Sequence, residues 1–243
     1  LKNHGRKAYL PIRAFMKFLN IFNPDFVITS TSPRFELALQ IAANYMNINS
    51  LAVGDLFLDK EYKYICNKDY SKNLSVFSKS TKKFLKDCGY RGSIFVKGNP
   101  AFDNLYEKAN FKKALYFREE LKLKESDILI LWICPPSNVN NNCIDSSLVL
   151  ESLVKYTKNR KNTKFLIRQH PNSQVLDPNI IYPNGIFCDN NIPIEICLYA
   201  ANKVLVFNST VLIQASLLEI PTLVYSKSNC PVYDPEFGLN VSS

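Results

Sequence analysis

Three small polar residues near the end of the chain, Asn208, Ser209 and Thr210, separate the apolar runs VLVF and VLIQASLLEIPTLVYS. The first run is typical of a buried strand, and the second starts with helical spacing. Ligands of parallel α/β sheets bind beyond the carboxyl ends of the strands, where unpaired N–H groups of a helix's first turn can hold a phosphate. The same residues can also serve only as helix caps, and local chemistry alone favours capping.

Gln214 lies four residues after Thr210 and therefore on the same face of the predicted helix. Side chains of a helix lean toward its N-terminus, so the amide is directed back at the cap. The surrounding positions are almost all apolar, which predicts that the amide needs a partner. A ribose hydroxyl would serve, and so would a backbone carbonyl.

A second polar group, RQHPN at residues 168–172, follows the predicted strand KFLIR. His170 is expected at the same sheet edge as Ser209, either as an ordinary turn residue or as a catalytic group that donates a hydrogen bond to a diphosphate. Strand alternation places Arg168 on the same face as His170. Its guanidinium binds phosphate or pairs with an acidic side chain, and the acidic partner is favoured.

Two further strand ends carry candidate residues. Ser137 and Asn138 follow DILILWIC and either line the ligand cleft or belong to an ordinary polar loop, which is favoured. Asp55 ends the run VGD and is the only candidate general base on that side, where it could deprotonate an acceptor hydroxyl. Its alternative role is to cap the next helix.

Metal ions and cofactors are not expected. The chain has only two histidines, His4 and His170, and its seven cysteines never form C-x-x-C, so a zinc site has few ligands available. Four of the cysteines lie in or beside apolar runs, which favours buried, reduced thiols over disulfides.

Short β-like runs alternate with helical ones along the 243 residues, which predicts an α/β fold with two Rossmann-like domains whose parallel sheets face a cleft. The Gly98-Asn99-Pro100 turn and a charged segment, residues 102–123, place the boundary within 98–112. We therefore expect domains 1–103 and 104–243. The run KYICN is expected as a short strand, and residues 102–123 as one basic helix.

Lys and Arg outnumber Asp and Glu by 30 to 21, and the positive field attracts nucleotides, anionic lipid or nucleic acid without choosing among them. No nucleic-acid-binding signature occurs, so nucleic acid is not an expected partner. The sequence lacks both an apolar run of about 20 residues and a signal peptide, which favours a cytoplasmic protein. The basic helices are solvated faces or make peripheral contact with the inner membrane surface.

RQHPN, the NST–helix unit with Gln214, and LLEIPTLVYS together resemble the C-terminal half of the GT-B superfamily. This superfamily includes nucleotide-sugar glycosyltransferases, UDP-N-acetylglucosamine 2-epimerases and bacterial capsule-polysaccharide transferases. The segment PDFVITSTSPRFELALQIAANYM and the element VKGNPAFDN resemble the superfamily's acceptor-side domain and its interdomain element.

The resemblance implies that Ser209 and Thr210 bind the donor diphosphate and that Gln214 binds the ribose, where the superfamily has an acidic residue. Asn208 is expected among the substrate-binding residues of the same loop. Glu219 replaces the superfamily's glycine. Residues 1–103 would form the acceptor-side domain, without its usual first strand and glycine-rich loop, and residues 104–243 the nucleotide-sugar-binding domain. Both ends of the chain are expected to be truncated.

The function implied is metal-independent transfer of a sugar from a nucleotide-diphosphate donor to a glycan or lipid-linked acceptor in surface polysaccharide biosynthesis. The alternatives are a nucleotide-sugar 2-epimerase of the same fold, which would need several carboxylates from the first domain, and a non-catalytic subunit that binds nucleotide sugars.

Overall fold

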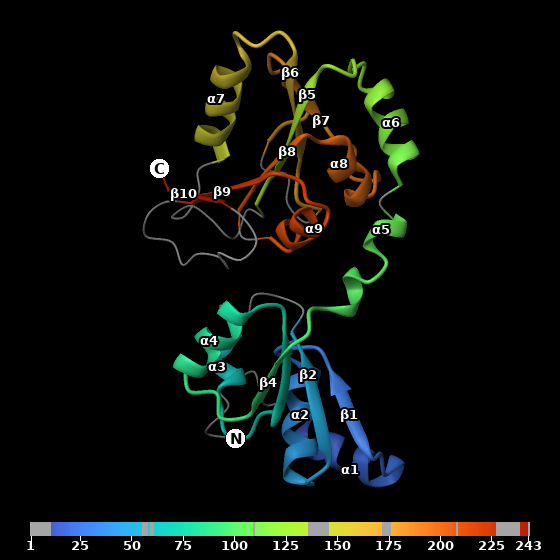
Figure 1. Ribbon diagram of the computed structural model, residues 1–243. Helices are drawn as coiled ribbons and strands as arrows, with labels where there is room; N and C mark the ends of the chain where they lie inside the picture. Colours follow the sequence, from blue (N-terminus) through green and yellow to red (C-terminus); the bar gives the residue numbers. More distant parts are fainter. Residues whose placement is uncertain are drawn as a thin grey trace. The chain divides into compact units, whose positions relative to one another are not determined.

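The computed structural model describes residues 11–54, 58, 61–108, 110–135, 146–171, 176–207, 209–226 and 239–242. The chain divides into two compact units, residues 1–100 and 101–243, and each unit has its own parallel sheet (Figure 1). The α/β class with two parallel sheets is the fold class that the sequence predicts. The division after Pro100 lies inside the interval 98–112 expected for the boundary.

The first unit has a four-stranded sheet in the order β1-β2-β3-β4, with all neighbouring strands parallel. Its strands are β1 Phe26–Thr29, β2 Asn49–Val53, β3 Asn73–Val76 and β4 Ser93–Val96. Its helices are α1 Ile12–Phe22, α2 Phe35–Tyr45, α3 Tyr62–Ile65 and α4 Lys79–Asp87.

The predicted strand KYICN is wrong, because this segment forms helix α3. Ile65 donates its N–H to the carbonyl of Glu61, and Cys66 donates to that of Tyr62, both at 3.0 Å. Ile65 is fully buried and Tyr62 packs against the same core. A spacing of three residues between these apolar side chains fits one face of a helix better than one face of a strand.

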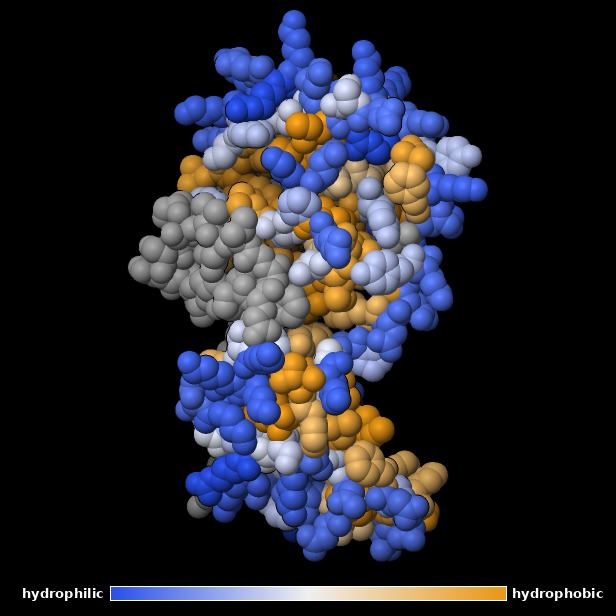
Figure 2. All heavy atoms as spheres, in the orientation of Figure 1, coloured by the Kyte–Doolittle hydropathy of each residue, from blue (hydrophilic) through white to orange (hydrophobic). Residues whose placement is uncertain are grey.

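The two faces of the first sheet differ. Val27, Ala52, Leu74 and Ile94 are buried on the face that the helices cover. On alternate positions of the same strands, Phe26 and Phe95 are 48% and 45% exposed. Figure 2 shows hydrophobic side chains gathered on the visible side of this unit.

The second unit has a six-stranded sheet in the order β10-β9-β8-β5-β6-β7, with every pairing parallel. Its strands are β5 Ile128–Ile133, β6 Thr163–Arg168, β7 Gly185–Phe187, β8 Lys203–Val206, β9 Thr222–Ser226 and β10 Leu239–Ser242. The helices are α5 Leu105–Lys108, α6 Phe111–Glu120, α7 Ser146–Thr157, α8 Ile194–Ala200 and α9 Val211–Leu217, and the 3-10 turn η2 spans Pro100–Phe102.

Helices cover both faces of this sheet (Figure 1). Val149, Leu150 and Leu153 of α7 pack in one cluster with Ile130 and Trp132 of β5. On the opposite face α8 contacts β5 and α9 contacts β8. Burial on both faces explains the nearly continuous apolar runs of β5, β6 and β8, as expected for an internal parallel sheet.

The segment 102–123 is not one helix. α5 and α6 are separate, and α6 begins after Asn110, whose side chain accepts a hydrogen bond from the Lys113 N–H at 3.2 Å. Arg118 of α6 donates to the carbonyls of Ala200 and Asp127, each at 2.6 Å, and so ties the helix to α8 and β5.

Within the described part of the chain, no helix is long and apolar enough to span a bilayer.

Candidate functional site

The strand order of the second sheet changes direction at β5. β6 and β7 follow on one side of β5, whereas β8, β9 and β10 follow on the other. In open α/β sheets such a switch point leaves a crevice beyond the carboxyl ends of the strands, where ligands bind. His170 follows β6 and Ser209 follows β8, so the strands that carry them lie two spacings apart, roughly 9.5 Å. The topology thus brings these two predicted residues to one sheet edge.

The residues after β8 start helix α9, which has seven residues. The Ser209 hydroxyl accepts a hydrogen bond from the Val211 N–H at 3.3 Å, and its carbonyl accepts from the Leu212 N–H at 3.1 Å. The Thr210 carbonyl accepts from the N–H groups of Ile213 and Gln214, whereas its hydroxyl makes no capping bond. These first-turn amides are therefore engaged within the helix start. A ligand at this point would meet side-chain hydroxyls, and the phosphate role of Ser209 and Thr210 remains a prediction.

Gln214 does not lie in a fully buried helix, which corrects the sequence-based expectation. Leu212, Ile213 and Ala215 are buried, but Gln214 is only half-buried and Leu217 is 40% exposed. Because α9 packs one side on the sheet, its other side remains accessible to water, which can satisfy the amide. The side chain therefore needs no protein partner, and its contact with a ribose remains a prediction.

The end of β6 is held by Gln169, a residue that the sequence analysis did not select. Its Nε2 donates to the Leu176 carbonyl and its Oε1 accepts from the Leu176 N–H, each at 2.9 Å. Gln169 is buried, and His170 beside it is half-buried. The only signal in the sequence is an amide between Arg168 and His170 at a strand end.

Among the described residues, the partners of Arg168 are backbone carbonyls and sulfur atoms and not an acidic side chain, which differs from the favoured interpretation of the sequence. Its Nη1 donates to the Ile192 carbonyl at 2.7 Å and contacts the sulfur atoms of Cys197 at 3.4 Å and Cys188 at 3.6 Å. Its Nη2 donates to the Asn190 carbonyl at 3.4 Å. The backbone of the β7–α8 connection supplies acceptors that a sequence pattern cannot reveal. The guanidinium is thus engaged by the connection, and a phosphate role for it remains a prediction.

Four predicted residues, Asp55, Ser137, Asn138 and Asn208, lie outside the described residues, so their roles also remain predictions. Among the residues that are described, no group of three or more His, Cys, Asp or Glu side chains could hold a metal ion.

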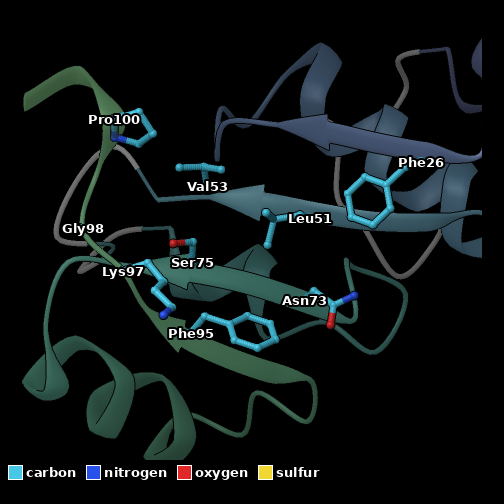
Figure 3. Close-up of a pocket in the computed structure, with 9 residues that line it drawn as sticks. All are labelled: Phe26, Leu51, Val53, Asn73, Ser75, Phe95, Lys97, Gly98 and Pro100. Carbon is cyan, nitrogen blue, oxygen red and sulfur yellow. The ribbon is translucent and has the colours of Figure 1, made fainter. Parts of the chain in front are cut away.

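A cavity of about 470 Å³ lies on the open face of the first sheet (Figure 3). Its described lining residues come from all four strands and the turn after them: Phe26, Leu51, Val53, Asn73, Ser75, Phe95, Lys97, Gly98 and Pro100. The lining is mainly apolar, with Lys97 as its charged member. Gly98 has φ of 78°, a backbone conformation that favours glycine, so it can turn the chain out of β4 beside the cavity. The lining residues 51 and 53, 73 and 75, and 95 and 97 are alternate positions along three strands, so they lie on one face of the sheet. This period of two was the signal in the sequence that these residues share a surface.

Comparison with known proteins finds similarity in structure. No family model matches the chain, and no curated protein matches its sequence. A protein assigned as UDP-N-acetylglucosamine 2-epimerase from Listeria monocytogenes matches 90% of this chain with a TM-score of 0.64 and 18% identity. The UDP-GlcNAc 2-epimerase of Neisseria meningitidis, solved with bound UDP-GlcNAc, matches 88% with a TM-score of 0.60 and 17% identity. Anabaena HepE in complex with UDP-glucose matches 95% with a TM-score of 0.62 and 11% identity.

These similarities establish the fold. The chain has an α/β fold with parallel sheets of the type found in GT-B epimerase structures, which confirms the predicted fold class. It spans 61% of the Listeria chain, 62% of the Neisseria chain and 68% of the Anabaena chain. The Listeria and Neisseria structures carry the name of a 2-epimerase, and none of these three structures is named as a glycosyltransferase.

Proposed function

We propose that this chain binds a UDP-sugar at the carboxyl edge of its six-stranded sheet and forms part of a nucleotide-sugar 2-epimerase. The observation that carries the proposal is the match of about nine tenths of the chain to UDP-GlcNAc 2-epimerases, one of them solved with UDP-GlcNAc bound. The switch point at β5 supports it independently, because nucleotides bind at such points in open α/β sheets.

In this proposal the diphosphate lies between the ends of β6 and β8. His170 donates a hydrogen bond to a phosphate oxygen from one side, and the hydroxyls of Ser209 and Thr210 donate from the other. Hydrogen bonds to charged groups contribute about 1.5–3 kcal/mol each. Gln214, one turn into α9, donates to or accepts from a ribose hydroxyl. Because the first-turn amides of α9 are already engaged, affinity comes from side chains rather than from the helix terminus.

Inversion at carbon 2 of the sugar exchanges a proton without net oxidation. A base removes the proton from one face of carbon 2 as the bond between carbon 1 and the diphosphate breaks, and an acid returns a proton to the other face as that bond forms again. Asp55 is the proposed base, on the sequence pattern alone. An N–H of His170 would stabilise the negative charge that develops on the diphosphate as its bond to the sugar breaks.

Sugar transfer to an acceptor is the second candidate function. It is favoured by the similarity to a structure that holds UDP-glucose, which shows that neighbours of this fold bind UDP-sugars other than UDP-GlcNAc. A transferase would place the acceptor against a base such as Asp55 and would break the bond between the sugar and the diphosphate.

Incubation with UDP-GlcNAc in deuterated water separates the candidates. An epimerase yields the carbon-2 epimer with solvent deuterium at that carbon, seen by proton NMR, and requires no acceptor. A transferase releases UDP only when an acceptor is present and leaves carbon 2 protonated. Binding of UDP without either change would support a non-catalytic binding subunit, and the absence of any UDP binding would contradict all three.

A further inference from the structure

Two cysteine side chains meet where β7 connects to α8. Cys188 directly follows β7 and is half-buried, whereas Cys197 lies within α8 and has no exposed surface. Their sulfur atoms are 3.4 Å apart. Arg168 of β6 contacts both sulfurs through Nη1, at 3.4 Å from Cys197 and 3.6 Å from Cys188. Both residues are free thiols.

We propose that Cys188 and Cys197 are a redox-active pair that a hydroperoxide converts into an intramolecular disulfide. The connection is already held in place: the Cys188 N–H donates to the Ile167 carbonyl at 2.9 Å, and Arg168 donates to the Ile192 carbonyl at 2.7 Å. A disulfide has a sulfur–sulfur distance of about 2.05 Å, so the sulfurs need to approach by roughly 1.4 Å. Rotation of the half-buried Cys188 side chain can supply such a movement.

The two thiols have different roles. The hydrogen bond with Cys197 and the nearby positive charge of Arg168 lower the pKa of Cys188 to about 7, although burial opposes this. The same hydrogen bond and burial raise the pKa of Cys197. Cys188 is therefore the thiolate that solvent can reach at neutral pH, and Cys197 is the buried thiol beside it. A low-pKa, accessible cysteine next to a second cysteine is the arrangement that oxidants select.

The reaction balances with one molecule of hydrogen peroxide. The Cys188 thiolate attacks one peroxide oxygen, the O–O bond breaks, and the other oxygen leaves as hydroxide and is protonated to water. Cys188 is then a sulfenic acid. The Cys197 sulfur attacks the Cys188 sulfur, the S–S bond forms, and the sulfenic oxygen leaves as a second water with the proton of Cys197. The two thiols lose two electrons, and the peroxide gains them.

Cys66 and Cys134 serve as internal references. Cys66 is half-buried like Cys188, but burial raises its pKa to about 11. Cys134 is buried, which raises its pKa to about 12. Both should remain thiols under conditions that oxidise Cys188.

Thiol mapping tests the proposal. The reduced chain is treated at neutral pH with a small excess of hydrogen peroxide, the reaction is stopped with catalase, and remaining thiols are alkylated. Residues 169–202 contain no Lys or Arg, so one tryptic peptide carries both cysteines, and a protease that cleaves before Asp189 separates them. We expect a peptide pair linked through Cys188 and Cys197, with Cys66 and Cys134 alkylated.

Four variants test the role of each group separately. C197S should stop at a Cys188 sulfenic acid that dimedone traps, and C66S should form the disulfide as the wild type does. R168L should slow oxidation of Cys188 several-fold at neutral pH, whereas R168K, which keeps the charge, should slow it less. Circular dichroism checks that each variant folds.

Equal alkylation of Cys188 and Cys66 after peroxide, or disulfides that link only different molecules, would overturn the proposal. The oxidation needs no nucleotide, so its failure would leave the proposed function untouched.

Discussion

Gln169 holds Leu176 by both of its backbone groups: the amide nitrogen donates to the carbonyl and the amide oxygen accepts from the N–H, each at 2.9 Å. This pair of bonds holds Leu176 at the end of β6, where His170 follows Gln169. A buried amide with two such bonds positions its neighbour while taking no part in chemistry.

The Q169A variant should therefore lose stability and nucleotide affinity together. Two lost hydrogen bonds cost about 1–3 kcal/mol of unfolding free energy, and His170 loses its fixed position. Urea unfolding and UDP titration measure the two effects. Q169E, which places a carboxylate oxygen against the Leu176 carbonyl in a buried position, should lose at least as much stability as Q169A. Unchanged UDP affinity in a destabilised Q169A would show that the end of β6 does not position a ligand.

Substitutions of Ser209 and Thr210 should differ in their effects on stability and on UDP binding. The Ser209 hydroxyl caps the Val211 N–H, so S209A should lower the free energy of unfolding by about 1 kcal/mol. The Thr210 hydroxyl makes no capping bond, so T210A should leave stability nearly unchanged. If that hydroxyl binds phosphate, T210A should weaken UDP binding about tenfold, which corresponds to about 1.4 kcal/mol.

Calorimetry decides between a cap and a phosphate site at the end of β8. Equal UDP affinity of wild type, T210A and the double variant S209A/T210A would mean that these residues only start a helix.

Gln214 should affect binding with little effect on folding. The side chain is half-buried and its amide makes no hydrogen bond with the described residues, so Q214L should change stability by less than about 0.5 kcal/mol. Loss of one neutral hydrogen bond to a ribose costs about 0.5–1.5 kcal/mol, a reduction of roughly two- to tenfold in UDP affinity. Q214E, which restores the acid of the resembling superfamily, should bind UDP at least as well as the wild type. Equal UDP affinity of Q214L and wild type would show that Gln214 does not bind the ribose.

The Cys188 thiolate should make stability depend on pH under reducing conditions. Its pKa is lowered in the folded chain from an ordinary value of 9.0 to about 7, mainly by the hydrogen bond with Cys197 and by Arg168. A lowered folded pKa contributes stability that is full above the unfolded value and is lost as pH falls through the folded value. Between these two values, the unfolding free energy of the wild type relative to C188S should therefore rise with pH. A constant difference across that window would show that Arg168 does not hold a thiolate.

The fold class could be predicted from the sequence because it depends on patterns within single strands and helices. Apolar runs such as residues 128–133 and 203–206 are continuous where parallel strands are buried on both faces, and helical spacing marks α1, α2 and α7. The segment KYICN was wrongly predicted as a strand because five residues of mixed polarity fit the spacing of a strand and the spacing of a helix equally well. Packing of Ile65 against the core stabilises the helix.

The site was less predictable, because it depends on which strands become neighbours. The sequence placed His170 and Ser209 at strand ends, but only the strand order puts β6 and β8 on either side of β5. Arg168 was assigned an acidic partner because acids are its usual ones; the acceptors that it uses, the carbonyls of Ile192 and Asn190, carry no signature in side-chain identity. Gln169 was missed for the same reason, since both of its partners belong to the backbone.

Titration of isotope-labelled protein with UDP, followed by amide NMR, tests whether UDP binds at the carboxyl edge of the six-stranded sheet. The account predicts saturable shifts at the amides of His170, Ser209, Thr210 and Gln214, and weaker shifts at these positions in T210A. Shifts confined to residues 11–100, or no shifts at any UDP concentration, would contradict a UDP-sugar site at the carboxyl edge of the six-stranded sheet.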